Sequence, residues 1–329
     1  MDTSQAGCVT RDLSPVSRSR LLADLLGLGV RPGGVLIVHA RLSAVGWIPG
    51  GADTVVQALL DALGPYGTLM VLCGWEHHCY DLDRWPIERR EAYLAEPPAF
   101  DPRHSAADRE MGRLAERVRT WPGALRSRHP LGSFAALGWR SEQLLADQPW
   151  DGMYGRGSPL EGLVEADGQV LLLGAPLETV TLLHYCEAVA VVAEPPDGPG
   201  KRWVRYRMPL RVDGDPRHDV GWRQFTELET GSDEDPGAEV LPYAEVVGHD
   251  VDPFEVIMTD ALGGGVGHSG RVGHAASHVL PARDLSVFGA RWIESRFGGV
   301  RARGGDAGHP VASDGGGGGR ARQERRGDV

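Results

Sequence analysis

The stretch VLLLGAPLETVTLLHYCEAVA, from Val170 to Ala190, carries the strongest structural signal in the chain. Its apolar start predicts a strand that is buried on both faces. The residues Gly174-Ala175-Pro176 predict a turn, and the pattern that follows predicts a helix over about 181–192. Because ligands bind at the carboxyl ends of strands in open α/β sheets, we expect a functional site where this strand ends.

Strand and helix patterns alternate on both sides of this stretch. Apolar runs predict buried strands at 35–39 and 68–73, and a shorter strand is expected at 133–137. Helical patterns lie at 17–29, 53–63, 111–119, 141–147, 254–262 and 285–296. This alternation favours a parallel or mixed sheet with helices on both faces.

Three segments do not follow the alternation. Residues 201–245 suggest antiparallel strands joined at Asp213-Gly214, a typical hairpin turn. Residues 76–110 are expected to be irregular, and so is the Gly-rich region around His268 to His278. A long irregular segment inside a compact domain is more often functional than filler.

Length, charge and cysteine use limit the class of protein. The chain has 329 residues, of which 41% are hydrophobic, so it can bury a large core. A net charge of −11 argues against a nucleic-acid partner and suits cationic small molecules. No apolar run approaches the 18 residues or so of a membrane span. Four cysteines without a regular framework, and no apolar signal sequence, predict a cytoplasmic protein with reduced thiols.

The same pass along the chain predicts its domain organisation. We expect residues 1–16 to form a loose leader and residues 17–298 to form a single domain. Residues 299–329 include five consecutive glycines, and we expect them to be a disordered Gly/Arg-rich tail.

The first candidate for chemistry is the histidine of the quoted stretch. Thr181 lies near the predicted helix N-terminus, His184 lies one turn in, and Glu187 follows at i+3. A helix N-terminus offers free N–H groups that can hold an anion or a developing oxyanion. The alternative is an ordinary histidine that packs in the core or on the surface, and spacing alone leaves both open.

A pair of acids is the second candidate. Glu227 and Glu229 share one face of a predicted strand, since side chains repeat every two residues. One such carboxylate could orient a histidine and stabilise its imidazolium. The alternative is two solvated acids on an edge strand.

The remaining clusters are less specific. The histidines and cysteines near 73–79 and 268–278 fit no standard zinc spacing, so no metal site is predicted. Arg126, Arg128 and His129 form a compact basic motif that could meet phosphates. Acidic and aromatic residues in the irregular segment could cradle a polyamine or simply form a solvated loop. These residues are Trp75, Glu76, Tyr80, Asp81, Asp83, Trp85 and Asp101.

Seven motifs together are specific for one family. They are VHARLSAVGWIPGG (38–51), GTLMVLCGW (67–75), AFDPRHS (99–105), RSRHP (126–130), GSPL (157–160), LLLGAPLETVTLLHYCE (171–187) and ARWIESRFG (290–298). From about Ser17 to Gly298 the chain resembles the aminoglycoside 3-N-acetyltransferases, or antibiotic N-acetyltransferases.

The resemblance implies both a fold and an activity. The fold is a three-layer α/β/α arrangement with a mixed central sheet and a smaller antiparallel strand region, unlike the GCN5-type acetyltransferases. The activity is acetyl transfer from acetyl-CoA to the 3-amino group of 2-deoxystreptamine antibiotics, which confers resistance and needs no metal. The expected partners are the aminoglycoside and acetyl-CoA, with no nucleic acid and no membrane, and dimerisation is left open.

The resemblance also implies roles for individual residues. The catalytic histidine falls on His184, and its partner acid falls on Glu229 or Glu227. Glu229 is favoured because Thr-Gly follows it. Tyr185 stands where many relatives have a second histidine, so His184 alone can serve as base. Contacts to acetyl-CoA are expected from His39, Arg41, Ser43, Arg126, His129, Ser158 and Thr181. Substrate contacts are expected from Trp75, Glu76, Tyr80, Asp81, Asp101 and Glu187.

Two rival functions are kept. One is an acyltransferase of the same fold that acts on another amine. The other is a non-catalytic protein that binds small molecules.

Overall fold

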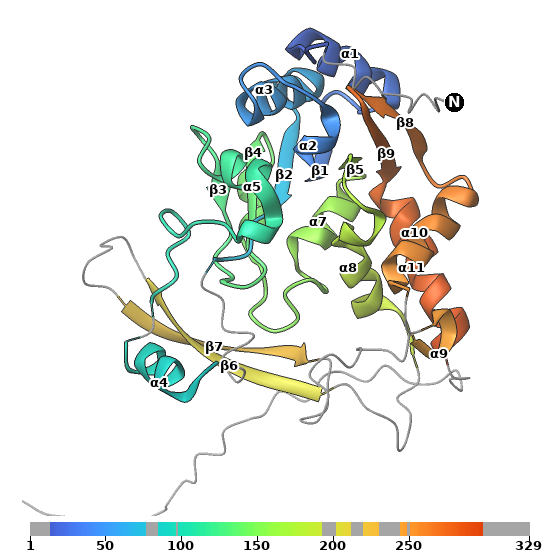
Figure 1. The fold of residues 1–329 in the computed structure, drawn as a ribbon. Helices are drawn as coiled ribbons and strands as arrows, with labels where there is room; N and C mark the ends of the chain where they lie inside the picture. The colour runs from blue at the N-terminus through green and yellow to red at the C-terminus, as the bar shows by residue number, and fades with distance from the viewer. Residues whose placement is uncertain are drawn as a thin grey trace, which may run out of the picture. The chain divides into compact units, whose positions relative to one another are not determined.

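A mixed seven-stranded sheet forms the centre of the protein (Figure 1). The computed structural model describes residues 14–76, 85–96, 98–192, 202–211, 220–229, 244–248 and 251–298. For 202–211, 220–229 and 244–245 it describes the backbone alone. The leader predicted at 1–16 lies outside the described residues except for 14–16, and the tail predicted at 299–329 lies outside them entirely.

Three parallel strands occupy the middle of the sheet. They are β2 (Thr68–Leu72), β1 (Val35–Ala40) and β5 (Gln169–Leu173), in that order. On one side β4 (Phe134–Gly138) and β3 (Leu125–Arg126) continue the sheet in antiparallel fashion. On the other side β9 (Ala275–Pro281) and β8 (His268–Val272) do the same. The predicted mixed sheet is confirmed.

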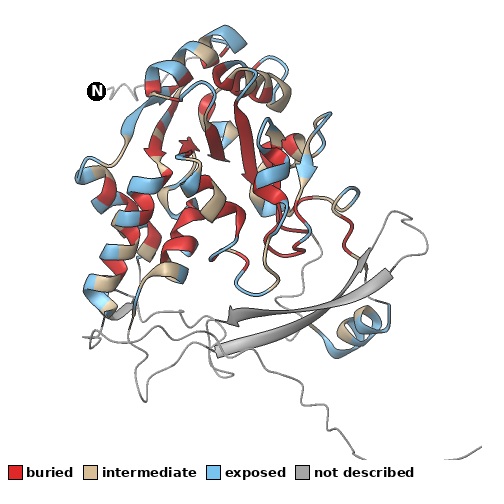
Figure 2. Ribbon diagram, turned by 180° about the vertical axis from the view of Figure 1, so that it is seen from behind, coloured by how far each residue is buried: buried red, intermediate tan, exposed pale blue. Residues whose placement is uncertain are grey.

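Alternating side chains of the central strands enter two separate cores. In β1, Leu36 and Val38 join the core on one face, whereas Val35 and Ile37 join the core on the other. Because both faces are buried, most positions in these strands are apolar, which explains the apolar runs such as 35–38. Figure 2 shows these strands as buried.

Helices cover both faces of the sheet. The first face carries α1 (Arg18–Leu28), α3 (Ala52–Leu63) and α5 (Gly112–Arg119). The second face carries five helices: α6 (Ser141–Leu145), α7 (Pro159–Glu165), α8 (Leu182–Val189), α10 (Pro253–Gly263) and α11 (Ala282–Phe297). The three-layer architecture is therefore confirmed.

Shorter elements complete the described chain. They are α2 (Leu42–Val45), α4 (Ile87–Ala95), η2 (Arg109–Met111), η3 (Leu177–Thr179) and α9 (Ala244–Val247). A separate antiparallel pair consists of β6 (Arg202–Arg211) and β7 (Val220–Glu229), as predicted. Its predicted turn at Asp213-Gly214 lies outside the described residues. No helix in the described ranges is long and apolar enough to cross a bilayer.

Three local expectations were wrong or incomplete. The region around His268 to His278 is not a loop, because β8 and β9 form a hairpin there, and Gly273 adopts a φ of 60° in its turn. The segment 76–110 contains α4, which buries none of its residues and so gives little helical signal. Val16, placed in the leader, is buried, and its N–H donates to the carbonyl of Trp47.

Candidate active site

The ends of β1 and β5 meet closely, and this contact builds the floor of the site. The N–H of Arg41, just after β1, donates to the carbonyl of Leu173 at 3.0 Å. Gly174 follows with a φ of 65°, and a Cβ there would lie 2.9 Å from Cβ of Ala44. Only glycine fits both this conformation and this approach. The turn that leads to α8 therefore lies against the loop that follows β1.

His184 lies in the first turn of α8 and bonds to the acid one turn further on. Its Nδ1 is 2.9 Å from Oε2 of Glu187. The Glu187 side chain is 12% exposed and that of His184 is 46% exposed. An ionised carboxylate can only accept a hydrogen bond, so the proton lies on Nδ1. The described residues offer Nε2 no hydrogen-bond partner, which leaves its lone pair available as a base.

Two aromatic rings enclose the imidazole. Tyr154 stacks on His184 with centroids 5.3 Å apart and an interplanar angle of 14°. Phe254 meets it edge to face at 4.9 Å and 65°. Sequence analysis missed both residues, because neither belongs to a motif that indicates catalysis. The only available signal was their apolar and aromatic character, which is equally typical of a core.

The acid that contacts His184 is not one of those predicted as its partner. Glu187 was predicted to bind substrate, yet its carboxylate holds the ring nitrogen. Glu227 and Glu229 lie on β7, in register with Val204 and Arg202. Their side chains lie outside what the structure describes, so their partner role stays a prediction.

Four residues predicted to contact acetyl-CoA lie around the meeting point of β1 and β5. His39 is the last residue but one of β1, and its Nε2 is buried without a hydrogen-bond partner among the described residues. Burial lowers the pKa of His39 to about 4, so the ring is neutral at pH 7. Arg41 directly follows β1 and Ser43 lies in α2, both exposed, and Thr181 is buried at the start of α8. Their cofactor role stays a prediction.

The other three residues of that set support the protein's own backbone. The Arg126 guanidinium donates to Oγ of Ser133 at 3.0 Å and also bonds the carbonyls of Gly74 and Ser105. Burial lowers its pKa to about 10, which leaves it charged at pH 7. These bonds tie together three loops and leave part of the guanidinium for another acceptor.

His129 and Ser158 are likewise engaged internally. His129 is 2% exposed, and its Nδ1 accepts from the N–H of Gly132 while Nε2 donates to the carbonyl of Trp150. Burial lowers the pKa of His129 to about 4. Ser158 caps α7 by accepting from the N–H of Leu160 at 3.2 Å. Both side chains shape the loops in which they lie, and their contact with acetyl-CoA stays a prediction.

The predicted substrate cradle is only partly assembled. Trp75 is 2% exposed and packs edge to face on Phe100 at 5.4 Å, so it presents no free face. Glu76 forms an ion pair with Arg109. Tyr80 and Asp81 lie outside the described residues. The substrate role of these four residues therefore stays a prediction.

Asp101 is also held by its own loop. Its Oδ2 bonds Nδ1 of His104 at 2.9 Å, and its Oδ1 accepts from the N–H of Arg103 at 2.8 Å. Burial raises the pKa of Asp101, but these hydrogen bonds outweigh burial and the net shift is downward. The carboxylate is therefore ionised and firmly oriented.

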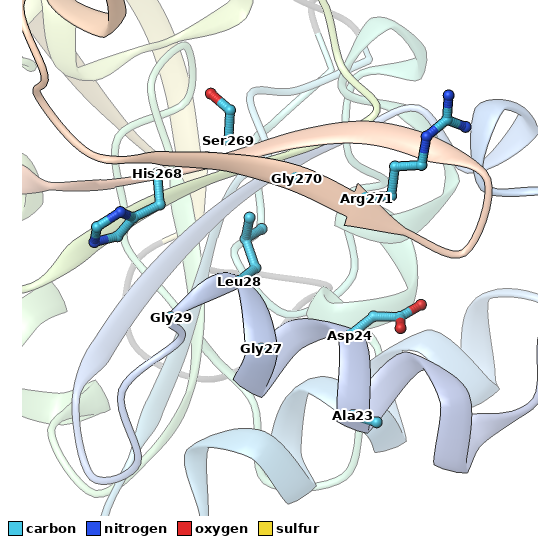
Figure 3. Close-up of a pocket in the computed structure, with 9 residues that line it drawn as sticks. All are labelled: Ala23, Asp24, Gly27, Leu28, Gly29, His268, Ser269, Gly270 and Arg271. Carbon is cyan, nitrogen blue, oxygen red and sulfur yellow. The ribbon is translucent and has the colours of Figure 1, made fainter.

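A well-formed hollow lies elsewhere on the molecule. Figure 3 shows it between the end of α1 and the edge strand β8, with a volume of about 520 Å³. Its lining includes Asp24, His268 and Arg271, and none of the predicted site residues. In the described ranges, no group of three or more His, Cys, Asp or Glu side chains is arranged to hold a metal ion.

Comparison with known proteins shows the family of the chain. The family model described as aminoglycoside 3-N-acetyltransferase matches residues 37–294. The chain is 47% identical over 293 residues to aminoglycoside N(3)-acetyltransferase VIII of Streptomyces fradiae, covering 89% of this chain and 96% of that protein. This chain belongs to the aminoglycoside 3-N-acetyltransferase family. Like the other members, it is an acetyl-CoA-dependent N-acetyltransferase.

Solved structures of aminoglycoside 3-N-acetyltransferases share its fold. The crystal structure of aminoglycoside acetyltransferase AAC(3)-Xa superposes with a TM-score of 0.77 at 44% identity, covering 86% of this chain and 94% of that one. The binary complex of AAC-IIIb with CoASH gives a TM-score of 0.73 at 39% identity, covering 88% of this chain and 100% of that one.

The residues at the strand ends fit an acyl-CoA cosubstrate. Nε2 of His39 is a buried polar atom without a partner in the described part of the chain, and an incoming ligand can supply that missing hydrogen bond. The Thr181 hydroxyl at the start of α8 has no side-chain capping bond either.

Proposed function

We propose that this chain acetylates the 3-amino group of 2-deoxystreptamine aminoglycosides and that His184 is the general base. The single observation that carries the proposal is the hydrogen bond between Nδ1 of His184 and Glu187. It fixes the tautomer, so that Nε2 carries the lone pair that accepts a proton. A half-exposed imidazole with one nitrogen held by a carboxylate is suited to acid–base work.

The chemistry follows from the state of the drug's amine. An ammonium group is not a nucleophile, so a proton must leave before or during attack on the thioester carbonyl. Nε2 of His184 takes this proton, and the Glu187 carboxylate stabilises the imidazolium that results. The N-terminal turn of α8 and Thr181 are the donors that we assign to the developing oxyanion. Collapse of the oxyanion breaks the C–S bond, and the departing CoA thiolate takes up the proton held on Nε2 of His184.

Charge supports a polycationic substrate. The chain carries a net charge of −11, which attracts a drug with several ammonium groups. Acetylation removes one positive charge from the drug and thereby weakens its attraction to RNA phosphates. We place the reaction in the cytoplasm, because Cys73 and Cys186 are free and buried, as in proteins of reducing compartments.

Glu187 is the orienting acid of this proposal. It is the carboxylate that the structure brings to His184, whereas Glu229 and Glu227 are supported by the resemblance alone. A second acid from β7 is compatible with this scheme, since Glu187 leaves the base nitrogen open.

Product analysis tests the proposed function. Purified protein is incubated with acetyl-CoA and kanamycin, neomycin, gentamicin or paromomycin, and release of CoA thiol is followed. Mass spectrometry and two-dimensional NMR then locate the acetyl group. We expect a single acetyl group on the 3-amino nitrogen of at least one drug. Transfer to a different nitrogen, or to an unrelated amine only, would overturn the proposal in favour of another acyltransferase activity.

A further inference from the structure

We propose that Tyr154 is a positioning residue, which clamps the His184 imidazole together with Phe254. This inference rests on the proposed function and deepens it. The three rings come from different elements: Tyr154 from the loop before α7, His184 from α8, and Phe254 from the first turn of α10.

The stacking geometry restricts the imidazole. With Tyr154 at 5.3 Å and nearly parallel, rotation of the His184 ring about its Cβ–Cγ bond would drive it into the tyrosine face. Phe254 at 4.9 Å adds a second wall. The bond to Glu187 alone would fix one nitrogen and still allow the ring to swing. The two aromatic rings therefore keep Nε2 of His184 pointing in one direction.

Tyr154 itself is braced by the sheet. Its ring meets Phe134 of β4 edge to face at 6.1 Å and 83°. A Cβ on Gly132 would lie 3.0 Å from Cε1 of Tyr154 and 2.5 Å from Sδ of Met153. There is thus no room for a methyl group beside the tyrosine, and close packing of this kind holds a side chain in one rotamer.

A side-chain amide fixes the loop that carries Tyr154. Nε2 of Gln148 donates to the carbonyl of Met153 at 3.1 Å and to that of Gly132 at 2.8 Å. Its Oε1 accepts from Oγ of Ser127 at 2.5 Å. The Gln148 side chain therefore holds both Met153, which directly precedes Tyr154, and Gly132, which packs against the Tyr154 ring.

The clamp acts on turnover rather than on binding. The stacked ring holds the imidazole in one orientation and does not contact either substrate in the proposed scheme. It also keeps the base in the productive geometry, and small misplacements of a catalytic group cost large factors in rate. Loss of the ring should lower kcat and leave the KM of both substrates nearly unchanged.

Two substitutions of Tyr154 and one control test the clamp. Tyr154→Leu removes the ring and should lower kcat about tenfold, whereas Tyr154→Phe keeps the ring and should stay within about threefold of wild type. Tyr66→Leu is the matched control, since Tyr66 is an exposed aromatic residue in the turn before β2. It should leave kcat unchanged, and thermal unfolding of each variant checks that the fold persists.

A wild-type measurement keeps the test independent of variant folding. A stacked tyrosine shifts the imidazole Cδ2–H and Cε1–H signals of His184 upfield in proton NMR, and the spectrum of His184→Ala assigns them. Absence of that shift overturns the clamp. An unchanged kcat in folded Tyr154→Leu, or a rise in KM alone, also overturns it. Full activity of His184→Ala would instead refute the proposed base, whatever the NMR signals show.

Discussion

In the proposed mechanism, the Glu187 carboxylate on Nδ1 decides that Nε2 of His184 acts as the base. Glu187→Gln keeps the size of the side chain but removes the charge that stabilises the imidazolium. We expect kcat to fall roughly 10- to 100-fold, with little change in the KM for acetyl-CoA. Steady-state kinetics with acetyl-CoA and an accepted aminoglycoside provide the measurement.

Glu165→Gln is the control for this substitution, because Glu165 is an exposed acid at the end of α7. Wild-type turnover in Glu187→Gln, together with a large loss in Glu229→Gln, would transfer the orienting role to β7.

The same residues show how far spacing predicts a site. The sequence places Glu187 three positions after His184, on the same side of a helix, yet we assigned it to the substrate. Spacing shows that two side chains can meet, but not which rotamer each adopts. Sequence analysis predicted the histidine and its N-terminal helix position, and rotamer choice then made Glu187 the partner.

At the scale of elements, Ser158 serves α7 as its N-cap. Its Oγ accepts from the N–H groups of Leu160 and Glu161, and Oε2 of Glu161 accepts from the N–H of Gly157 at 2.6 Å. Ser158→Ala should lower the free energy of unfolding by about 1 kcal/mol, measured by urea denaturation. Ser286→Ala, which removes a buried helical serine without a capping role, should cost less.

An equal loss of unfolding free energy in Ser158→Ala and Ser286→Ala would contradict the capping role of Ser158. The KM for acetyl-CoA of Ser158→Ala is an independent readout, since a rise would support the cofactor contact predicted for the same hydroxyl.

Elements that are buried on both sides were predictable, and exposed ones were not. The apolar runs at 35–39 and 68–73 match β1 and β2 to within a residue, because double burial allows only apolar side chains. β8 is exposed over most of its length and contains Gly270, so no alternation marks it as a strand. The helix α4 buries none of its residues, so no apolar stripe predicted it as a helix.

For the whole molecule, two histidines with lowered pKa values predict acid sensitivity. Burial lowers the pKa of His39 and of His129 to about 4, against about 6.5 in an unfolded chain. The unfolded state therefore binds more protons between these values, so stability is fully present above pH 6.5 and falls as the pH drops toward 4. Each group contributes on the order of 1–3 kcal/mol to that loss.

Urea denaturation at several pH values measures this loss. In His129→Gln, the decrease in unfolding free energy between pH 7 and pH 4.5 should be smaller by on the order of 1–3 kcal/mol. An identical pH profile in the variant would contradict a neutral, buried His129.

Residues that are far apart in the sequence but in contact in the fold could not be predicted from the sequence. Tyr154 lies 30 residues before His184 and Phe254 lies 70 residues after it, yet both rings contact the imidazole. No local period relates such positions, so only the packing of α10 and of the loop before α7 reveals them. The family motifs led to the chemistry, but they did not predict what surrounds the base.

The rate of acetyl transfer by His184→Ala is the sharpest test of His184 as the general base. Wild type and variant are compared at saturating acetyl-CoA and aminoglycoside, with urea denaturation as the check on folding. The account predicts a fall in kcat of roughly 10²- to 10⁴-fold with the unfolding free energy nearly unchanged. A folded variant that turns over at the wild-type rate would contradict it.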